Sequence, residues 1–200
     1  MAAAPRPRTG LSVIKIGGWL TTMPGALDQV CTAVGQASRE HHLLVVPGGG
    51  PFAEAVRDFE RLVGVSADAA HWMAILAMDQ YAHVLASRIP QAVLVEEPGT
   101  VSDVVCRGKV AVLAPSRWMR SADVLPHSWD VTSDSIAAFV AGAIGADRLV
   151  LIKPTEGGDP VDAYFATALP SGMPYVVLSW DRMGDLPSRL SGQTAGVAPA

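Results

Sequence analysis

Two of the three lysines in this sequence stand beside glycines at the ends of apolar runs. Lys15 begins the segment KIGG, and Lys153 begins the segment KPTEGG. A lysine ammonium is a compact positive charge, and glycine lets a phosphate approach the backbone N–H groups closely. The other twelve basic residues are arginines, so lysine is scarce in this chain. Both segments therefore predict contacts with phosphate oxygens, although each alone also fits an ordinary turn after a strand.

A run of three glycines, Gly48, Gly49 and Gly50, precedes Pro51, a residue well suited to the first turn of a helix. Glycine loses the most conformational entropy on folding, so three in succession are costly unless side chains must be absent. The N–H groups of such a loop, at the start of a helix, form a cradle for an anion. The run predicts a phosphate-binding loop, and a flexible turn from strand to helix is the structural alternative.

The segment WDVTSDS, from Trp129 to Ser135, precedes an apolar run. Thr132 or Ser133 is a good N-cap, and Asp134 in the first turn suits the positive end of the helix dipole. This structural account explains the three residues by itself. A carboxylate between two lysines would also hold both ammonium groups in place. Two lysines, two glycine-rich loops and one aspartate together are the groups that phosphoryl transfer requires.

The elements that must position these groups alternate between short apolar runs and longer amphipathic stretches. The predicted strands are Leu11–Ile16, Leu43–Val46, Ala92–Val95, Val110–Ala114, Leu149–Ile152 and Tyr175–Leu178. The predicted helices are Gly25–Glu40, Pro51–Leu62, Ser66–Ile89, Asp134–Ile144, Val161–Leu169 and Asp181–Leu190. Strands that are apolar nearly throughout are typical of a parallel sheet buried on both faces. The alternation predicts an α/β fold, a three-layer αβα sandwich with a mainly parallel central sheet, in which ligands bind at the carboxyl ends of strands.

Length and composition limit the function classes. Two hundred residues, half of them hydrophobic, predict one domain over residues 10–192, with flexible ends at 1–9 and 193–200. A net charge of −4 gives no basic surface for nucleic acid or an anionic membrane, and no apolar stretch reaches the ~18 residues of a membrane span. Cys31 and Cys106 are expected to be reduced thiols in a cytoplasmic protein. The motifs of P-loop enzymes, dinucleotide-binding proteins, zinc peptidases and serine esterases are missing, and no metal-ligand pattern is present.

The predicted helix Ser66–Ile89 contains the apolar run Trp72–Met78. Such a run leaves apolar side chains on every face of a helix, so this helix is either central to the core or packed against a second subunit. We expect a homodimer contact here.

Candidate contacts to a substrate lie in two further places. Trp129 and the segment Leu125–His127 could frame a flat aromatic substrate by stacking, or they could be core and turn. Arg57 and Arg61 lie four residues apart on a predicted helix. They could reach a phosphate of the substrate, or they could form a solvated helix face.

The order of these motifs resembles that of the amino acid kinase superfamily. K-x-G-G follows the first predicted strand, P-G-G-G follows the second, T-S-D precedes a helix, and a lysine–acid–glycine segment follows a later strand. The segments AHWMAILAMD (70–79) and LPHSWDVTSDSIA (125–137) are similar to those of small archaeal kinases of this superfamily. Those kinases phosphorylate aminomethylfuran-methyl phosphate in the methanofuran biosynthesis of one-carbon metabolism.

The resemblance implies a carbamate kinase-like fold, an ATP·Mg²⁺ donor, a phosphate or carboxylate as acceptor, and a dimer formed through helices. It implies that Lys15 and Lys153 stabilise the transferring phosphoryl group while Asp134 orients both lysines. On the nucleotide side it implies contacts from Gly17, Gly18, Gly49, Glu156, Gly157 and Gly158. On the acceptor side it implies contacts from Gly48, Gly49, Gly50, Trp129, Thr132 and Ser133.

The chain departs from the family pattern after Lys153. Pro154 follows the lysine directly, and Glu156 stands where many relatives have aspartate. The segment after Gly158 is short for a region in which relatives place their adenine-binding loops. The alternative hypothesis is therefore a non-catalytic nucleotide- or oxyanion-binding (storage) protein on the same fold.

Overall fold

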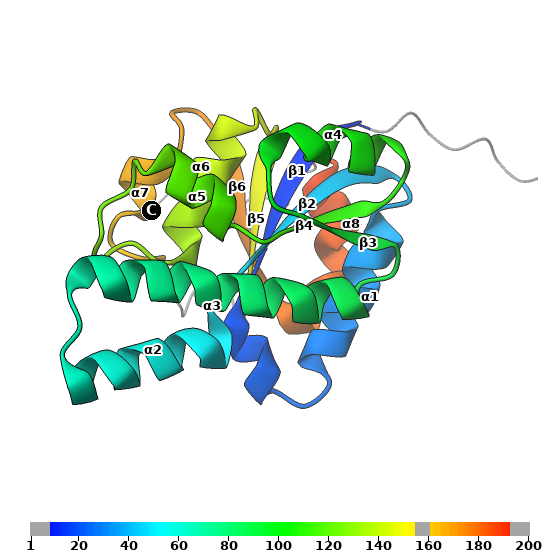
Figure 1. The fold of residues 1–200 in the computed structure, drawn as a ribbon. Helices are drawn as coiled ribbons and strands as arrows, with labels where there is room; N and C mark the ends of the chain where they lie inside the picture. Colours follow the sequence, from blue (N-terminus) through cyan, green and yellow to red (C-terminus); the bar gives the residue numbers. More distant parts are fainter. Residues whose placement is uncertain (1–8, 155–160, 193–200) are drawn as a thin grey trace, which may run out of the picture.

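Six parallel strands form one sheet in the order β3-β4-β2-β1-β5-β6 (Figure 1). The structure is a computed structural model and describes residues 9–154 and 161–192. The strands are β1 (Thr9–Ile16), β2 (His41–Pro47), β3 (Ala92–Val95), β4 (Val110–Leu113), β5 (Arg148–Lys153) and β6 (Tyr175–Ser179). The predicted α/β fold is confirmed, and every predicted strand is present with ends within two residues of the prediction.

Helices cover both faces of the sheet (Figure 1). They are η1 (Gly18–Thr22), α1 (Ala26–Ala37), α2 (Gly50–Val63), α3 (Ala67–Arg88), α4 (Pro98–Cys106), α5 (Ser116–Ala122), α6 (Ser133–Ala143), α7 (Phe165–Ala168), η2 (Trp180–Asp185) and α8 (Leu186–Leu190). No helix in the ranges 9–154 and 161–192 is long and apolar enough to cross a membrane.

The period of two along each strand divides the apolar core into two clusters, one on each face of the sheet. Ile14 and Ile152 belong to the cluster that contains α1 and α8, whereas Val13 and Leu151 belong to the cluster that contains α5, α6 and α7. The same alternation continues one step further along both strands. It places the side chains of Lys15 and Lys153 on the face that α6 covers.

Helices α2 and α3 form a hairpin that projects from one side of the sheet (Figure 1). Helix α2 ends at Gly64, whose left-handed conformation (φ +73°) terminates the helix. Helix α3 begins at Ser66, whose hydroxyl accepts the N–H of Ala69 at 3.2 Å. Helix α3 contributes to both core clusters, so a position in the core explains much of its apolar character.

Two helical predictions are wrong in part, and two helices were missed. Helices α4 and α5 were not expected from the sequence, and Cys106 is the last residue of α4. The predicted helix Val161–Leu169 is reduced to α7, because the segment before it bonds to the 130–135 region. The predicted helix 181–190 is split into η2 and α8, with Pro187 in the first turn of α8. The flexible ends expected at 1–9 and 193–200 fall, apart from the backbone of Thr9, outside the described residues.

Candidate active site

Lys15 and Lys153 bind the same carboxylate at the carboxyl ends of two adjacent strands. The Nζ atom of Lys15 lies 2.9 Å from Oδ1 of Asp134, and Nζ of Lys153 lies 2.8 Å from Oδ2. The lysines come from β1 and β5, and Asp134 comes from the first turn of α6. The three residues, here called the lysine–aspartate cluster, are at most 7% exposed. The structure thus brings together the three predicted catalytic residues.

The two lysines decide the ionisation of Asp134. Burial opposes the charged form, but the attraction and hydrogen bond of Lys15 and the hydrogen bond of Lys153 outweigh it and lower the pKa of Asp134. The carboxylate therefore stays ionised near neutral pH. Two ammonium groups and one carboxylate leave these three side chains with one net positive charge, which suits the binding of a phosphoryl group.

The two glycine loops, 17–18 and 48–50, pack directly against each other beside this cluster. A Cβ atom on Gly18 would lie 2.0 Å from the Cα atom and 2.2 Å from the nitrogen of Gly50. Gly50 has a φ of +57°, a conformation that other residues rarely adopt. The N–H of Gly48 donates to the carbonyl of Ile16 at 2.8 Å. The glycines are therefore required by the contact between loops, and this contact places the N-terminus of α2 at the site.

Asp162 fixes the loop that carries Asp134. Its Oδ2 atom accepts the N–H of Thr132 at 2.9 Å, the hydroxyl of Thr132 at 2.7 Å and the N–H of Ser135 at 3.0 Å. The carboxylate of Asp162 therefore caps α6, where the sequence suggested that Thr132 or Ser133 would do so. These bonds hold the first turn of α6, which carries Asp134.

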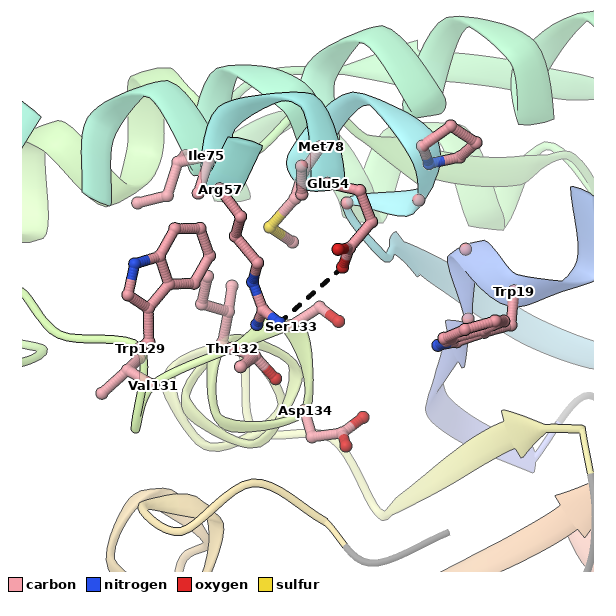
Figure 2. A pocket seen from close by; sticks show the side chains of 18 of the residues that line it. Trp19, Glu54, Arg57, Ile75, Met78, Trp129, Val131, Thr132, Ser133 and Asp134 are labelled. Carbon is pink, nitrogen blue, oxygen red and sulfur yellow. Dashed lines mark ion pairs between the residues drawn. The ribbon is translucent and has the colours of Figure 1, made fainter. Parts of the chain in front are cut away.

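A cavity of about 600 Å³ opens over the cluster (Figure 2). Its inner end consists of the lysine–aspartate cluster and both glycine loops. Ile75 and Met78 of α3 form an apolar side. Its outer end lies between α2 and the 128–133 loop and includes Arg57, Glu60 and Trp129. A volume of this size is typical of a small-molecule site.

Trp129 organises the outer end. Its indole N–H donates to Oε2 of Glu60 at 2.6 Å, and the guanidinium carbon of Arg57 lies 4.4 Å from the centre of the indole ring. Arg57 also pairs with Glu54 at 3.7 Å, and its guanidinium points toward Ser133 and Asp134 (Figure 2). Arg57 therefore covers one face of the Trp129 ring. A substrate that stacks on this ring, as predicted, would have to use the other face. Arg57 lines the cavity, whereas Arg61 is exposed and pairs with Asp58.

His127 ties the loop before Trp129 to the helices around it. Its Nδ1 lies 2.7 Å from Asp68 and its Nε2 lies 2.9 Å from Asp123, and these hydrogen bonds raise the pKa of His127. Neutral imidazole has one N–H, so two carboxylate partners favour the imidazolium form. The ring stacks on His71 at 4.1 Å. Burial and the charge of His127 lower the pKa of His71 to about 4, so His71 is neutral near pH 7.

Comparison with known proteins agrees with this geometry. The model of the amino acid kinase family matches residues 10–157. The chain belongs to the amino acid kinase family. Two solved structures share the fold: the uridylate kinase of Archaeoglobus fulgidus (TM-score 0.70, 17% identity, 92% of this chain and 97% of that chain) and the UMP kinase of Bacillus anthracis (TM-score 0.69, 12% identity, 93% of each chain).

Two relatives of known activity are similar in sequence to this member of the amino acid kinase family. One is (5-(aminomethyl)furan-3-yl)methyl phosphate kinase of Methanocaldococcus jannaschii, 28% identical over 150 residues, or 74% of this chain and 67% of that protein. The other is the uridylate kinase of Methanococcoides burtonii, 25% identical over 153 residues, or 74% of this chain and 61% of that protein. The match thus spans less than two thirds of the second relative. Both relatives are small-molecule kinases.

The structure gathers most of the predicted site residues of this family member around one cavity. Gly17, Gly18, Gly49, Gly50, Trp129, Thr132 and Ser133 line the cavity with the lysine–aspartate cluster. Gly48 is buried behind them, against Gly18. Glu156, Gly157 and Gly158 lie outside the described residues. Within the described residues no group of three or more His, Cys, Asp or Glu side chains could hold a metal ion.

Sequence reasoning missed Glu60 and Asp162. Glu60 occupies an unremarkable position on an amphipathic helix, and its contact with Trp129 joins residues 69 positions apart. Asp162 acts on a loop 30 positions earlier in the chain. Only the packing of α2 and of the segment before α7 reveals these roles.

Proposed function

We propose that this member of the amino acid kinase family transfers the γ-phosphoryl group of ATP to a small-molecule phosphate monoester. The observation that carries the proposal is the lysine–aspartate cluster, which lies at the inner end of the cavity beside the two glycine loops. Two buried ammonium groups held by one carboxylate can stabilise negative charge that moves between two phosphates. The homologous kinases support the same reaction class.

In the reaction an oxygen of the acceptor phosphate attacks the γ-phosphorus of ATP. The bond from this phosphorus to the bridging oxygen breaks, and ADP leaves with that electron pair. Such a transfer needs positioning and positive charge rather than covalent catalysis by the protein. Lys15 and Lys153 supply the charge, and Asp134 keeps both ammonium groups directed at one point. The N–H groups of Gly18 and Gly49 bind donor phosphates, with Gly17, Glu156, Gly157 and Gly158 proposed on the nucleotide side. The N–H of Gly17 itself donates to the carbonyl of Ile152 at 3.2 Å, so Gly17 borders the nucleotide without offering this donor.

Mg²⁺ is proposed to bind together with ATP. Asp134 is occupied by two lysines, and no cluster of three possible ligands exists within the described residues. Mg²⁺ keeps several waters and is often held mainly by substrate phosphates. The phosphate oxygens of ATP are therefore its expected ligands, and the ion would neutralise part of the charge on those oxygens.

The proposed acceptor is (5-(aminomethyl)furan-3-yl)methyl phosphate, below called aminomethylfuran phosphate, the compound named by one relative. Arg57 points into the cavity toward the inner end, where a guanidinium can bind a phosphate through two hydrogen bonds (Figure 2). Gly48–Gly50, Thr132 and Ser133 border the same space. Ile75 and Met78 offer an apolar surface for the furan ring.

We also propose a homodimer formed through α3 and an action in the cytoplasm. Leu76 of α3 is 46% exposed, and Phe59, Leu62 and Val63 at the end of α2 are exposed as well. The two free thiols and the nucleotide donor fit a reducing, ATP-rich compartment.

An assay of ADP release tests the proposed function. The full-length protein with ATP and Mg²⁺ is mixed with aminomethylfuran phosphate, with UMP, or with no acceptor. The proposal predicts ADP release that requires the furan phosphate and exceeds the rate with UMP. Calorimetric binding of ATP·Mg²⁺ with no acceptor-dependent ADP would instead favour the non-catalytic binding protein.

A further inference from the structure

The outer end of the cavity holds a carboxylate without a cationic partner among the described residues. Glu60 is half-buried, and the one hydrogen bond of its side chain within that part of the chain is from the indole N–H of Trp129. The ion pairs of α2 engage the other acidic residues, Glu54 with Arg57 and Asp58 with Arg61. An indole N–H is neutral, so the negative charge of Glu60 is not compensated. A half-buried carboxylate has lost part of its hydration, and a cationic group of a ligand can supply the missing partner.

Trp129 contacts both this carboxylate and the guanidinium of Arg57. Its N–H edge holds Glu60, while its face is covered by Arg57. In Figure 2 the indole nitrogen lies on the side of the ring away from Asp134, and the Arg57 guanidinium lies on the side toward Asp134. The indole thus separates a positive charge that faces the inner end from a negative charge at the outer end. His71, also in the cavity wall, is neutral near pH 7 and supplies no cation.

The helix fixes how far apart the two charged ends lie. Glu60 is ten residues after Gly50 on α2, which at 1.5 Å per residue is about 15 Å along the helix axis. Arg57 lies between them, about 4.5 Å before Glu60. The cavity therefore offers positive charge at the inner end, an apolar side at Ile75 and Met78, and negative charge at the outer end. Its ligand should have a phosphate at one end and a cation at the other.

We propose that Glu60 binds a cationic group of the acceptor, a primary ammonium, and so selects organic phosphates that carry an amine. Trp129 is the positioning residue that holds the carboxylate toward the cavity. The inference rests on the proposed function for the placement of the acceptor phosphate. It adds a second recognition point at the opposite end of the same molecule.

Calorimetry with two acceptors tests the role of Glu60. The probes are aminomethylfuran phosphate and its amine-free analogue (5-methylfuran-3-yl)methyl phosphate, each titrated into protein loaded with Mg²⁺ and a non-hydrolysable ATP analogue. Glu60→Gln removes the charge but keeps an oxygen that can accept the Trp129 N–H. Asp28→Asn, which removes an exposed carboxylate paired with Arg88 on the surface, is the control.

The wild-type protein should bind the amine-bearing probe at least about tenfold more tightly than the analogue, because only the ammonium gains a hydrogen bond between charged groups. Glu60→Gln should abolish most of this difference by weakening the amine-bearing probe alone, and Asp28→Asn should leave it unchanged. Equal weakening of both probes, no weakening of either, or no binding of either probe to the wild type would each overturn the proposal. ADP release is measured separately, so binding with the predicted preference but without turnover would contradict only the kinase assignment.

Discussion

The ammonium of Lys153, at the end of β5, lies 2.8 Å from Oδ2 of Asp134, a carboxylate in the first turn of α6. The same carboxylate binds Lys15 through its second oxygen. Both lysines are buried, so each would be costly in a low-dielectric interior without a partner. Two cations directed at one anion place positive charge at the inner end of the cavity.

Loss of either lysine should reduce turnover far more than stability. In Lys15→Ala or Lys153→Ala the remaining lysine still pairs with Asp134, so we expect a folded protein by circular dichroism. The charge on the transferring group loses one partner, and kcat should fall by a factor on the order of 10²–10³. Lys109→Ala is the matched control because the third lysine is exposed and remote from the cavity. Normal turnover in both cluster variants would show that the reaction occurs elsewhere.

Arg57→Ala should weaken the acceptor and leave the nucleotide unaffected. The guanidinium lines the cavity between Trp129 and Glu54, whereas Arg61, one turn further along α2, is exposed. We expect a rise of about tenfold or more in the acceptor KM for Arg57→Ala and less than about twofold for Arg61→Ala, because a charged hydrogen bond contributes about 1.5–3 kcal/mol. Steady-state kinetics with each substrate varied in turn provide the check. Equal effects of the two variants would mean that Arg57 belongs to a solvated surface.

The contact between the glycine loops predicts a severe effect of a single methyl group. A Cβ atom at Gly18 would overlap the backbone of Gly50, so Gly18→Ala should cost about 1–3 kcal/mol of unfolding free energy and distort the inner end of the cavity. Gly99 in α4 meets no atom within 4 Å, and Gly99→Ala should be neutral or slightly stabilising. Urea unfolding of both variants gives the comparison. A neutral Gly18→Ala would mean that the loops are farther apart than the structure has them.

The two carboxylates around His127 predict a pH-dependent contribution to stability. Hydrogen bonds to Asp68 and Asp123 raise the pKa of His127 above its ordinary 6.5. A raised pKa in the folded protein stabilises it below the unfolded value, and this stabilisation is lost as the pH rises through the folded pKa. The Tm difference between wild type and His127→Gln should therefore be largest near pH 6 and shrink toward pH 9. His83→Gln, at an exposed position, should show no such trend. A Tm difference that stays constant or grows with pH would contradict a charged His127 held between Asp68 and Asp123.

The sequence was informative wherever a feature depends on local periodicity. The apolar strands placed Lys15 and Lys153 at strand ends, and alternation then set both on the face of α6. The pairing of Asp134 with both lysines was expected from its position between them in the order of motifs. The strand-end positions of the two lysines, and the face of the sheet on which they lie, are set by the residues next to them in the chain.

Features that depend on packing between distant segments were not accessible in the same way. Asp162 caps α6 across 27 to 30 positions, and this displaced the capping role expected of Thr132. The contact of Glu60 with Trp129 depends on the packing of α2 beside the loop that carries Trp129. Arg57 likewise has the sequence pattern of an ordinary surface charge, and only the folded structure places it in the wall of the cavity.

Phosphorus NMR of the complete reaction tests the central claim most directly. The wild-type protein is incubated with ATP, Mg²⁺ and aminomethylfuran phosphate, and Lys153→Ala is run in parallel. The account predicts that the monoester and ATP resonances decline together while ADP and an organic diphosphate appear in equal amounts, and that Lys153→Ala is nearly inactive over the same time. An unchanged monoester resonance, whether ATP is left intact or is hydrolysed to ADP and inorganic phosphate, would contradict it.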